Sequence, residues 1–558
     1  MKRKLLLSAF AAIGLFCVSS VSGQSIAITN ARIVTVSGAA IEKGTVVVRD
    51  GLIEAVGANV STPADAQVID ANGLTVYPGF IDSLSSAGLQ ARPAAAAGGV
   101  PGGGGGQAAQ QAAAQVNASN SNYSFGIRPE LSAVDDLRAG ETQFDAVRNA
   151  GFTSTLTVGR TGIFNGRSAL INLAGDSVSA MVVKEPFAQH ISFTTIGGYP
   201  GSLLGTFSAL RQMMLDARRL HDWQKAYATN PKGLKRPNDD KSLEALYPIL
   251  NRQMPVVFNA NTENEIVRAL DLAKEFNLLA VIAGGHGAGN LVSRLKEQNV
   301  PVLLSLNFPK RTAAASPEAD AENLSLLRFR AEVPKVAAKL AQGGVKFAFQ
   351  SGGLASMNDF FANANKAVEG GLAKDAAIRA MTLSAAEILD VENRVGSIEA
   401  GKIANLAVAK NDIFATDRFV PYIVVDGKLF EQKETARPAA GRGPAGARPA
   451  ETTPAPNVAN VAGTYAITID VPGQTLTGTM VLTQQGDVIN GTMTTQLGVS
   501  QIVGGKATVD GFSFAATVEF GGQSIPIAAK ATVTGNAMSG TIDSPQGSVP
   551  FTGTRTPR

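Results

Sequence analysis

Residues 255–350 alternate short apolar runs with segments of helical periodicity, and this alternation limits the fold more than any other feature of the chain. Runs of four or five mostly apolar residues are typical of strands buried on both faces. Strands that alternate with helices predict a parallel sheet with helices on its faces. The strand-like runs are residues 255–258, 279–283, 302–306 and 346–349, and the helical segments are residues 263–276 and 291–298.

Two segments of low sequence complexity divide the chain. Residues 91–122 are rich in Ala, Gly and Gln, and residues 433–460 are rich in Pro, Ala and Gly. Neither segment has enough apolar bulk to offset the entropy that is lost on ordering. We therefore expect a flexible loop at the first segment and an interdomain linker at the second.

Residues 461–558 have a different pattern. Alternating runs such as residues 465–469, 479–483, 512–516 and 529–533 are separated by Gly-containing turns. About eight strands of this kind predict a small antiparallel barrel or sandwich. Its role is open between a packing or solubility module and a ligand-binding barrel.

The N-terminus has the three-part pattern of a secretory signal peptide. Cations at positions 2–4 precede an apolar run over residues 5–18, and small residues lie just before Gln24. The pattern predicts a signal peptide over residues 1–23 and export to the periplasm or the medium, with no membrane span left after cleavage. A retained anchor is the alternative, although the run is short for a span.

Cysteine content and charge exclude several classes of function. The only cysteine, Cys17, lies inside the predicted signal peptide, so we expect no disulfide, thiol nucleophile or thiolate metal site in the mature chain. The formal net charge is +4, from 49 Lys and Arg against 45 Asp and Glu, and three of the cations lie at positions 2–4. Because the rest is nearly neutral, no nucleic-acid partner is expected.

Ordered motifs on both sides of the alternating region carry a family resemblance. They include Asp50-Gly51, Pro78-Gly79-Phe80-Ile81-Asp82, residues 382–386, Gly396-Ser397-Ile398, Gly401-Lys402 and residues 424–427. Residues 26–82 and 382–428 resemble the two ends of the amidohydrolase superfamily domain, and residues 255–306 resemble the middle of its imidazolonepropionase-like members. The resemblance covers most of residues 26–430.

The resemblance implies an α/β fold with a distorted (β/α)8 TIM barrel. The barrel would span residues 76–385 and contain the low-complexity loop. A flanking β-sandwich would combine residues 24–75 with residues 386–432. The all-β segment after the linker would form a separate domain.

The resemblance also implies a site at the carboxyl ends of the barrel strands, where family members bind metal through His-x-His, two further histidines and an aspartate. The bound metal activates water at neutral pH. The corresponding positions in this sequence are Leu84, Ser86, Asn259, Gly284 and Gly352. None offers an imidazole or a carboxylate, so we expect that the metal site is lost and that no metal or other cofactor is bound.

The chain has three histidines, and His286 is the strongest catalytic candidate among them. It follows the ligand position Gly284 by two residues, on an expected flexible loop at the functional end of the barrel, with Asn259 as a second candidate. A structural role for His286 is the alternative. His190 is expected in the core or at a cap, and His221 on a solvated helix face.

Three functions remain open on the sequence. A metal-free homologue would bind a small-molecule ligand or a protein partner, either an intact amidohydrolase homologue or a second copy of the chain. Alternatively, an active hydrolase would cleave carbon–nitrogen bonds other than peptide bonds through an atypical site centred on His286. The third option is an exported binding module in the C-terminal β domain.

Overall fold

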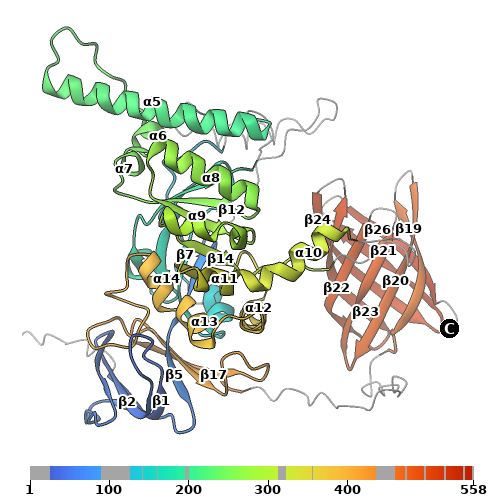
Figure 1. Ribbon diagram of the computed structural model, residues 1–558. Helices are drawn as coiled ribbons and strands as arrows, with labels where there is room; N and C mark the ends of the chain where they lie inside the picture. Colours follow the sequence, from blue (N-terminus) through green and yellow to red (C-terminus); the bar gives the residue numbers. More distant parts are fainter. Residues whose placement is uncertain are drawn as a thin grey trace, which may run out of the picture. The chain divides into compact units, whose positions relative to one another are not determined.

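The computed structural model describes residues 25–89, 123, 126–140, 142–159, 161–194, 200–311, 322–354, 356–434, 459–471, 474–495, 498–520, 523–544 and 547–555. The predicted signal peptide, the loop at residues 91–122 and nearly all of the predicted linker lie outside these residues. The chain divides into two compact units, Met1–Thr435 and Ala436–Arg558, each with a core of its own (Figure 1).

The first unit contains a barrel whose parallel strands are β6 (Phe80–Ser85), β7 (Phe152–Thr157), β11 (Gln189–Ser192), β12 (Val256–Ala260), β13 (Ala280–Gly284), β14 (Val302–Ser305) and β15 (Phe347–Gln350). β6 pairs with β7, and β11 to β15 pair in sequence order. The four strand-like runs that were predicted within residues 255–350 are β12 to β15, so the predicted alternation is confirmed.

Between β7 and β11, the barrel contains a segment that runs antiparallel to both of these strands. β8 (Phe164–Arg167) and β9 (Ala169–Asn172) follow each other with one residue between them. β8 pairs antiparallel with β11, β9 pairs antiparallel with β7, and β10 (Val182–Lys184) pairs antiparallel with β9. Because this segment is antiparallel to both neighbours, β7 and β11 run the same way, and the barrel is distorted as predicted.

A hydrogen bond joins the first and last strands of the barrel. The Ser351 N–H, directly after β15, donates to the Asp82 carboxylate on β6 at 2.8 Å. Asp82 is buried, and the same carboxylate oxygen accepts the Leu84 N–H at 3.3 Å. The contact connects residues that are 269 positions apart in the sequence.

Alternate residues of the barrel strands face two different cores. Val257, Val281 and Leu303 belong to the inner core, and the residues that follow them in sequence pack in the outer core against surrounding helices. α14 (Leu383–Ile388) contributes Ala385 to the inner core. The inward-facing residues of the strands are therefore apolar in the inner core and polar near the carboxyl ends of the strands.

Helices lie around the barrel (Figure 1). They are α2 (Ala133–Asp136), α3 (Asp145–Arg148), α4 (Val178–Met181), α5 (Leu203–Thr229), α6 (Lys241–Glu244), α7 (Tyr247–Leu250), α8 (Glu263–Phe276), α9 (Val292–Glu297), α10 (Leu324–Glu332), α11 (Val336–Gln342), α12 (Met357–Glu369) and α13 (Lys374–Ala380), with short 3-10 helices at Thr142–Phe144, Ala288–Asn290 and Val333–Lys335. α8 and α9 confirm the two predicted helical segments. None of the helices among the described residues has the length and apolar character needed to cross a membrane.

A sheet built from both flanks of the barrel completes the first unit. Its strands are β1 (Ile26–Ile33), β2 (Ile41–Arg49), β3 (Leu52–Gly57), β4 (Gln67–Asp70), β5 (Thr75–Pro78), β16 (Leu406–Lys410), β17 (Phe419–Val425) and β18 (Lys428–Glu431). Their order is β18-β17-β16-β5-β1-β2-β3, with β4 also paired to β1. β5 and β16 join the two flanks, with Tyr77 opposite Ala407, and the strands enclose a separate apolar core.

The second unit is a closed antiparallel barrel of β19 (Gly463–Val471), β20 (Gln474–Gln485), β21 (Val488–Thr495), β22 (Gly498–Ala507), β23 (Gly511–Phe520), β24 (Gln523–Thr534), β25 (Ala537–Ser544) and β26 (Gly547–Arg555). β19 and β26 close it, with Tyr465 opposite Arg555. The Arg555 guanidinium lies 5.1 Å from the centroid of the Tyr465 ring and donates to its hydroxyl. The expectation of a barrel or sandwich is resolved in favour of the barrel.

Candidate functional site at the mouth of the barrel

The carboxyl ends of β6 and of β11 to β15, with the loops that follow them, form one end of the barrel, which we call the mouth. Asn259 lies near the end of β12, His286 two residues beyond β13, and Gly352 two residues beyond β15. Leu84 and Ser86 lie at the end of β6. The positions named from the sequence are therefore collected at the end where barrel active sites are found.

Three neutral polar side chains form a closed hydrogen-bond cluster at the mouth. Asn259 Nδ2 donates to Ser192 Oγ at 2.8 Å and to Asn165 Oδ1 at 3.1 Å. Ser192 Oγ donates to Asn165 Oδ1 at 2.7 Å. Asn165 comes from the antiparallel β8 and Ser192 from β11. Of these three residues, only Asn259 could be predicted from the sequence, because no spacing signal indicates that a reversed strand brings Asn165 to the same place.

His286 is held firmly at the mouth. It is 6% exposed, its backbone N–H donates to Asn261 Oδ1 at 3.2 Å, and its Nε2 lies 2.9 Å from the Ser305 carbonyl oxygen. The rings of Phe308 and Phe329 approach the imidazole edge-on, with centroids 6.0 and 6.1 Å away. The expectation of a flexible loop is therefore wrong, since packing and three neighbouring segments fix this residue.

The partner of Nε2 determines the tautomer of His286. A carbonyl oxygen only accepts hydrogen bonds, so Nε2 carries the hydrogen in the neutral ring and Nδ1 carries the lone pair. Nδ1 is buried without a hydrogen-bond partner among the described residues. Burial lowers the pKa of His286, and the bond to Ser305 opposes this effect only in part. The imidazole is neutral, and its basic nitrogen is enclosed by protein.

The end of β6 is apolar where the resemblance places a metal ligand. Leu84 is 8% exposed and packs in the inner core with Ile81 and Val158. Ser86 is exposed, whereas Ser85 before it shares a hydrogen bond with the hydroxyl of a residue on β7. The Leu84 side chain therefore contributes to packing, and its backbone N–H donates a hydrogen bond to the Asp82 carboxylate.

The two glycine positions have backbone conformations that suit glycine. Gly284 has φ +100° and Gly352 has φ +61°. A Cβ atom at position 352 would lie 2.1 Å from Ser305 Oγ, so an aspartate there would require Ser305 to move. No group of three or more His, Cys, Asp or Glu within the described residues could hold a metal ion. The donors present at the mouth do not fit the metal that the fold family implies.

Among the described residues, the other two histidines share no hydrogen bond with the cluster of Asn165, Ser192 and Asn259. His190, two residues before Ser192 on β11, is fully buried, and neither ring nitrogen has a hydrogen-bond partner among the described residues. Burial lowers the pKa of His190 to about 3. His221 on α5 is half-buried against Tyr247, with ring centroids 4.5 Å apart, so the expectation of a solvated face is wrong for this side chain.

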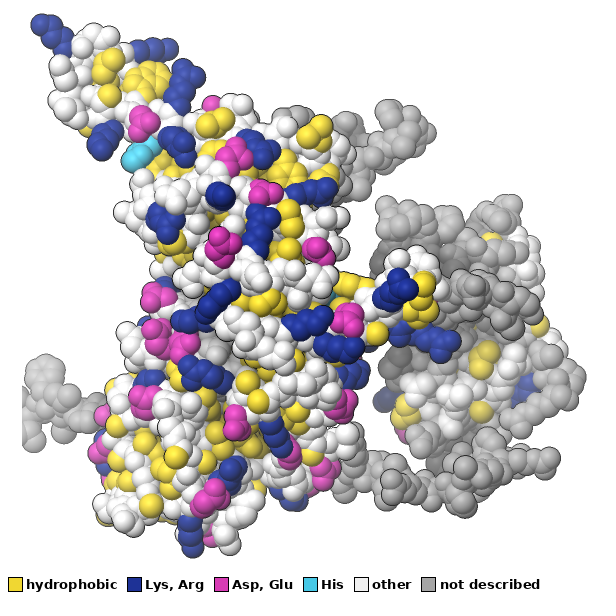
Figure 2. Space-filling view, viewed as in Figure 1, with side chains coloured by type: hydrophobic (Ala, Val, Ile, Leu, Met, Phe, Trp, Pro, Cys, Tyr) yellow, Lys and Arg dark blue, Asp and Glu magenta, His cyan; other side chains and the backbone are white. Residues whose placement is uncertain are grey.

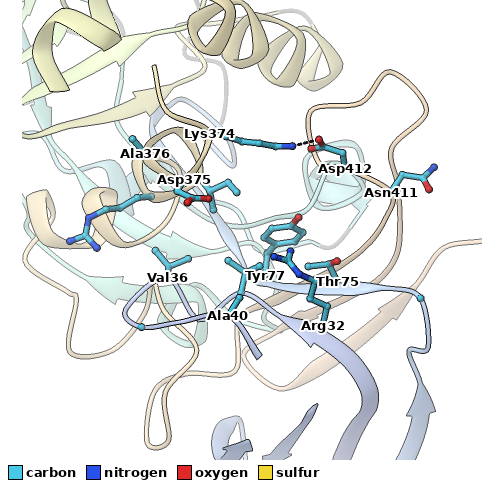
Figure 3. A pocket seen from close by; sticks show the side chains of 15 residues that line it. Arg32, Val36, Ala40, Thr75, Tyr77, Lys374, Asp375, Ala376, Asn411 and Asp412 are labelled. Carbon is cyan, nitrogen blue, oxygen red and sulfur yellow. Dashed lines mark hydrogen bonds and ion pairs between the residues drawn. The ribbon is translucent and has the colours of Figure 1, made fainter. Parts of the chain in front are cut away.

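A separate cavity of about 850 Å³ lies between the flanking sheet and α13 (Figure 3). The cations that line it are already paired, because Lys374 forms an ion pair with Asp412, Arg32 with Glu42 and Arg379 with Glu387. Tyr77 on β5 also lines it, and burial together with the Asp412 charge raises the pKa of this phenol. None of its lining residues belongs to the mouth, so we do not assign the family's chemistry to this cavity.

A distorted barrel with its polar positions at the strand ends, joined to a sheet made from both flanks, defines the amidohydrolase class of fold. The family model described as Amidohydrolase family matches residues 141–430, about half of the chain, and the chain belongs to this family. No curated protein matches it.

Several solved structures are similar to this chain, and the first of those below supports the fold. An amidohydrolase from Thermotoga maritima is 23% identical, with a TM-score of 0.59, and the match covers 73% of this chain and 100% of that one. A prolidase complexed with N-methylphosphonate-L-proline is 18% identical over 74% and 100% of the two chains, with a TM-score of 0.43. An adenosine deaminase from Xanthomonas campestris with bound zinc is 15% identical over 73% and 92%, with a TM-score of 0.38.

Proposed function

We propose that this chain is an exported amidohydrolase-family protein that has lost the family's metal site and binds a small, neutral, polar molecule at the mouth. The observation that carries the proposal is the set of residues at the five ligand positions: Leu84, Ser86, Asn259, Gly284 and Gly352. A zinc-type site needs at least three nitrogen, sulfur or carboxylate donors. These positions supply no such donor, so the scaffold is retained without the family's means of activating water.

The titratable groups that remain at the mouth cannot activate water in place of the metal. The metal lowers the pKa of bound water from about 15.7 to about 7, and a general base would have to supply an equivalent activation. The lone pair of His286 is enclosed at Nδ1. The Asp82 carboxylate already accepts the N–H groups of Leu84 and Ser351. Both groups are engaged in holding the barrel together.

The polar cluster around Asn259 supports ligand binding. Asn259 is half-buried, and its Oδ1 accepts no hydrogen bond from a described residue. Ser192 and Asn165 accept from its Nδ2 and so fix the orientation of the amide. An oriented neutral amide suits a ligand hydroxyl, amide or carbonyl group. We extend the proposal to a protein partner that would contact the same scaffold. This partner would be either a second copy of the chain or an intact family homologue.

Metal content and turnover test the proposal. The purified mature chain is expected to contain substoichiometric transition metal, to keep its unfolding midpoint on treatment with a chelator, and to show no turnover of N-acyl or cyclic amides with or without added Zn²⁺. In a screen of neutral hydroxyl and amide compounds, some are expected to raise the unfolding midpoint of the chain. Zn²⁺ is expected to leave this midpoint unchanged. Intact mass of the same sample is expected to place its first residue near Gln24.

Matched variants separate the alternatives. Zn²⁺-stimulated turnover that is lost in His286→Ala but kept in His221→Ala would establish the active hydrolase instead. If a ligand still raises the unfolding midpoint of the Asn259→Leu variant, the ligand binds somewhere other than the mouth. A retained N-terminal segment on a membrane-extracted chain would reject export while leaving the loss of the metal site standing.

A further inference from the structure

α5 is longer than its packing against the rest of the first unit requires. Its 27 residues form a helix about 40 Å long. Its buried residues end at Leu220, and none of residues 221–229 is buried. The last two turns therefore project beyond the body of the first unit, as Figure 1 shows.

Residues 223–236 at the projecting end carry four cations and no acidic residue, and the exposed Asp222 and Asp239 flank them. Lys225 lies on α5, and Lys232, Lys235 and Arg236 lie on the segment that returns toward α6. We call residues 223–236 the basic tip. All four cations are exposed, and none forms an ion pair with a residue that the structure describes. Unlike the paired cations of the cavity beside α13, they are free to meet an external negative charge.

Aromatic and apolar side chains lie among these cations. Trp223 and Tyr227 are half-buried, and Leu234 is 42% exposed. Trp223 Nε1 donates to the Lys235 carbonyl oxygen at 3.0 Å, which fastens the returning segment to the helix. Figure 2 shows Lys and Arg side chains gathered around apolar surface at this projecting end. The basic tip thus has both a charged and an apolar component.

We infer that the basic tip binds the surface of a bilayer that contains anionic phospholipid. A Lys or Arg near such a surface contributes roughly a fivefold gain in binding, and four can act together at a projecting end. Trp and Tyr are favoured at the level of the headgroups, and Leu234 is placed to enter the boundary of the acyl chains. The contact is peripheral, and it is independent of the proposed function of the mouth.

The distribution of charge favours a lipid surface over nucleic acid. The chain as a whole has a net charge of +4, whereas nucleic-acid binding usually depends on a basic surface that extends along a groove or strand. The four cations are confined to 14 residues that also include Trp223 and Leu234. A compact cluster beside an exposed apolar side chain matches the chemistry of an anionic headgroup layer.

The full chain provides its own probe, because Trp223 is the only tryptophan. Titration with vesicles of phosphatidylcholine plus phosphatidylglycerol is expected to shift the Trp223 emission to shorter wavelength, and vesicles of phosphatidylcholine alone are expected to leave it unchanged. At about 0.5 M salt the response should be largely lost, since surface charges are screened over a few ångströms. Co-sedimentation of protein with the vesicles gives the binding constant.

Charge variants distinguish the basic tip from the rest of the surface. The fourfold variant Lys225→Gln, Lys232→Gln, Lys235→Gln and Arg236→Gln is expected to bind at least tenfold more weakly. The matched control, Lys43→Gln, Arg311→Gln, Arg328→Gln and Lys433→Gln, removes four exposed cations elsewhere and should bind as the parent does. Equal losses in both variants, equal binding to neutral vesicles, or binding to soluble polyphosphate but not to vesicles would each overturn the inference.

Discussion

His190 is a polar side chain that the barrel encloses without a hydrogen-bond partner from the described residues. It shares the inward direction of Ser192, two residues further along β11. Burial lowers its pKa to about 3, so the folded chain keeps this imidazole neutral at every pH near neutrality. The unfolded chain, by contrast, protonates it below its ordinary pKa of about 6.5.

This difference predicts a pH dependence of stability. Between pH 6.5 and about pH 3 the unfolded state binds the extra proton, so the free energy of unfolding should fall by about 1.4 kcal/mol per pH unit as the pH decreases. His190→Leu removes the titrating group. The free energy of unfolding can be measured by urea unfolding, followed by Trp223 emission, near pH 7 and near pH 5. Its decrease between these two pH values should be about 2 kcal/mol smaller in the variant than in the parent. Identical losses would mean that folding does not lower the pKa of His190.

At this scale the sequence allowed the positions at the mouth to be predicted, but not their partners. Asn259 and Gly352 were placed at strand ends from the family motifs, and the structure places them there. The bond from Asn259 to Asn165 depends on a strand of only four residues that contains Gly166, too short to show a hydrophobic period. The burial of His286 depends on Phe329, which arrives from a helix 43 positions later.

The start of α8 links a helix cap to the mouth. The Glu265 carboxylate accepts the N–H of Asn261 at 2.8 Å and of Thr262 at 2.9 Å, and Thr262 Oγ1 accepts the Glu265 N–H. Asn261, held in this way, accepts the backbone N–H of His286. One capping box therefore orients the loop after β12 and supports the loop after β13.

Removal of either half of the capping box should cost stability. Glu265→Ala and Thr262→Ala are each expected to lower the free energy of unfolding by about 1 kcal/mol, and the double variant should lose less than the sum because the two groups complete one motif. Glu275→Ala serves as the control, since its exposed ion pair with Arg211 is worth less than about 1 kcal/mol. Urea unfolding by Trp223 emission provides the values, and strict additivity would argue against a shared cap.

Among the elements, long periodic segments were predictable and the reversed strand was not. α8 spans the predicted residues 263–276, because its apolar positions repeat at helical spacing behind Thr262. The segment of β8 and β9 has no comparable pattern, and its direction is decided by pairing with β7 and β11. Tertiary pairing of this kind overrides what a short window of sequence contains.

At the scale of the whole molecule, the two units have separate cores and separate sheets. The C-terminal barrel closes on itself through β19 and β26, and its apolar interior includes Met480, Phe512 and Phe551. Closure leaves no strand edge to be covered by the first unit. These features indicate that the second unit has what it needs for independent folding.

A fragment of residues 459–558 is therefore expected to fold alone. Its circular dichroism should show a cooperative thermal transition within a few degrees of the corresponding transition in the full chain. Because the fragment has no tryptophan, Trp223 emission reports the first unit separately in the full chain. Arg555→Ala, which removes the contact with Tyr465 at the closure, should lower the midpoint of the fragment and of the second unit equally. A fragment without a cooperative transition would show that the first unit is required.

The strand pair that joins the two flanks of the first unit also sets the order of events during synthesis. Tyr77 and Ala407 lie opposite each other in the finished sheet. A ribosome that adds about 5–20 residues per second delivers them on the order of tens of seconds apart. During that interval one hydrogen-bonding edge of β5 has no partner, and the nascent chain is exposed to pairing with other chains. The time at which the first unit becomes complete is thus governed by delivery of its C-terminal flank, not by how quickly its early strands can form.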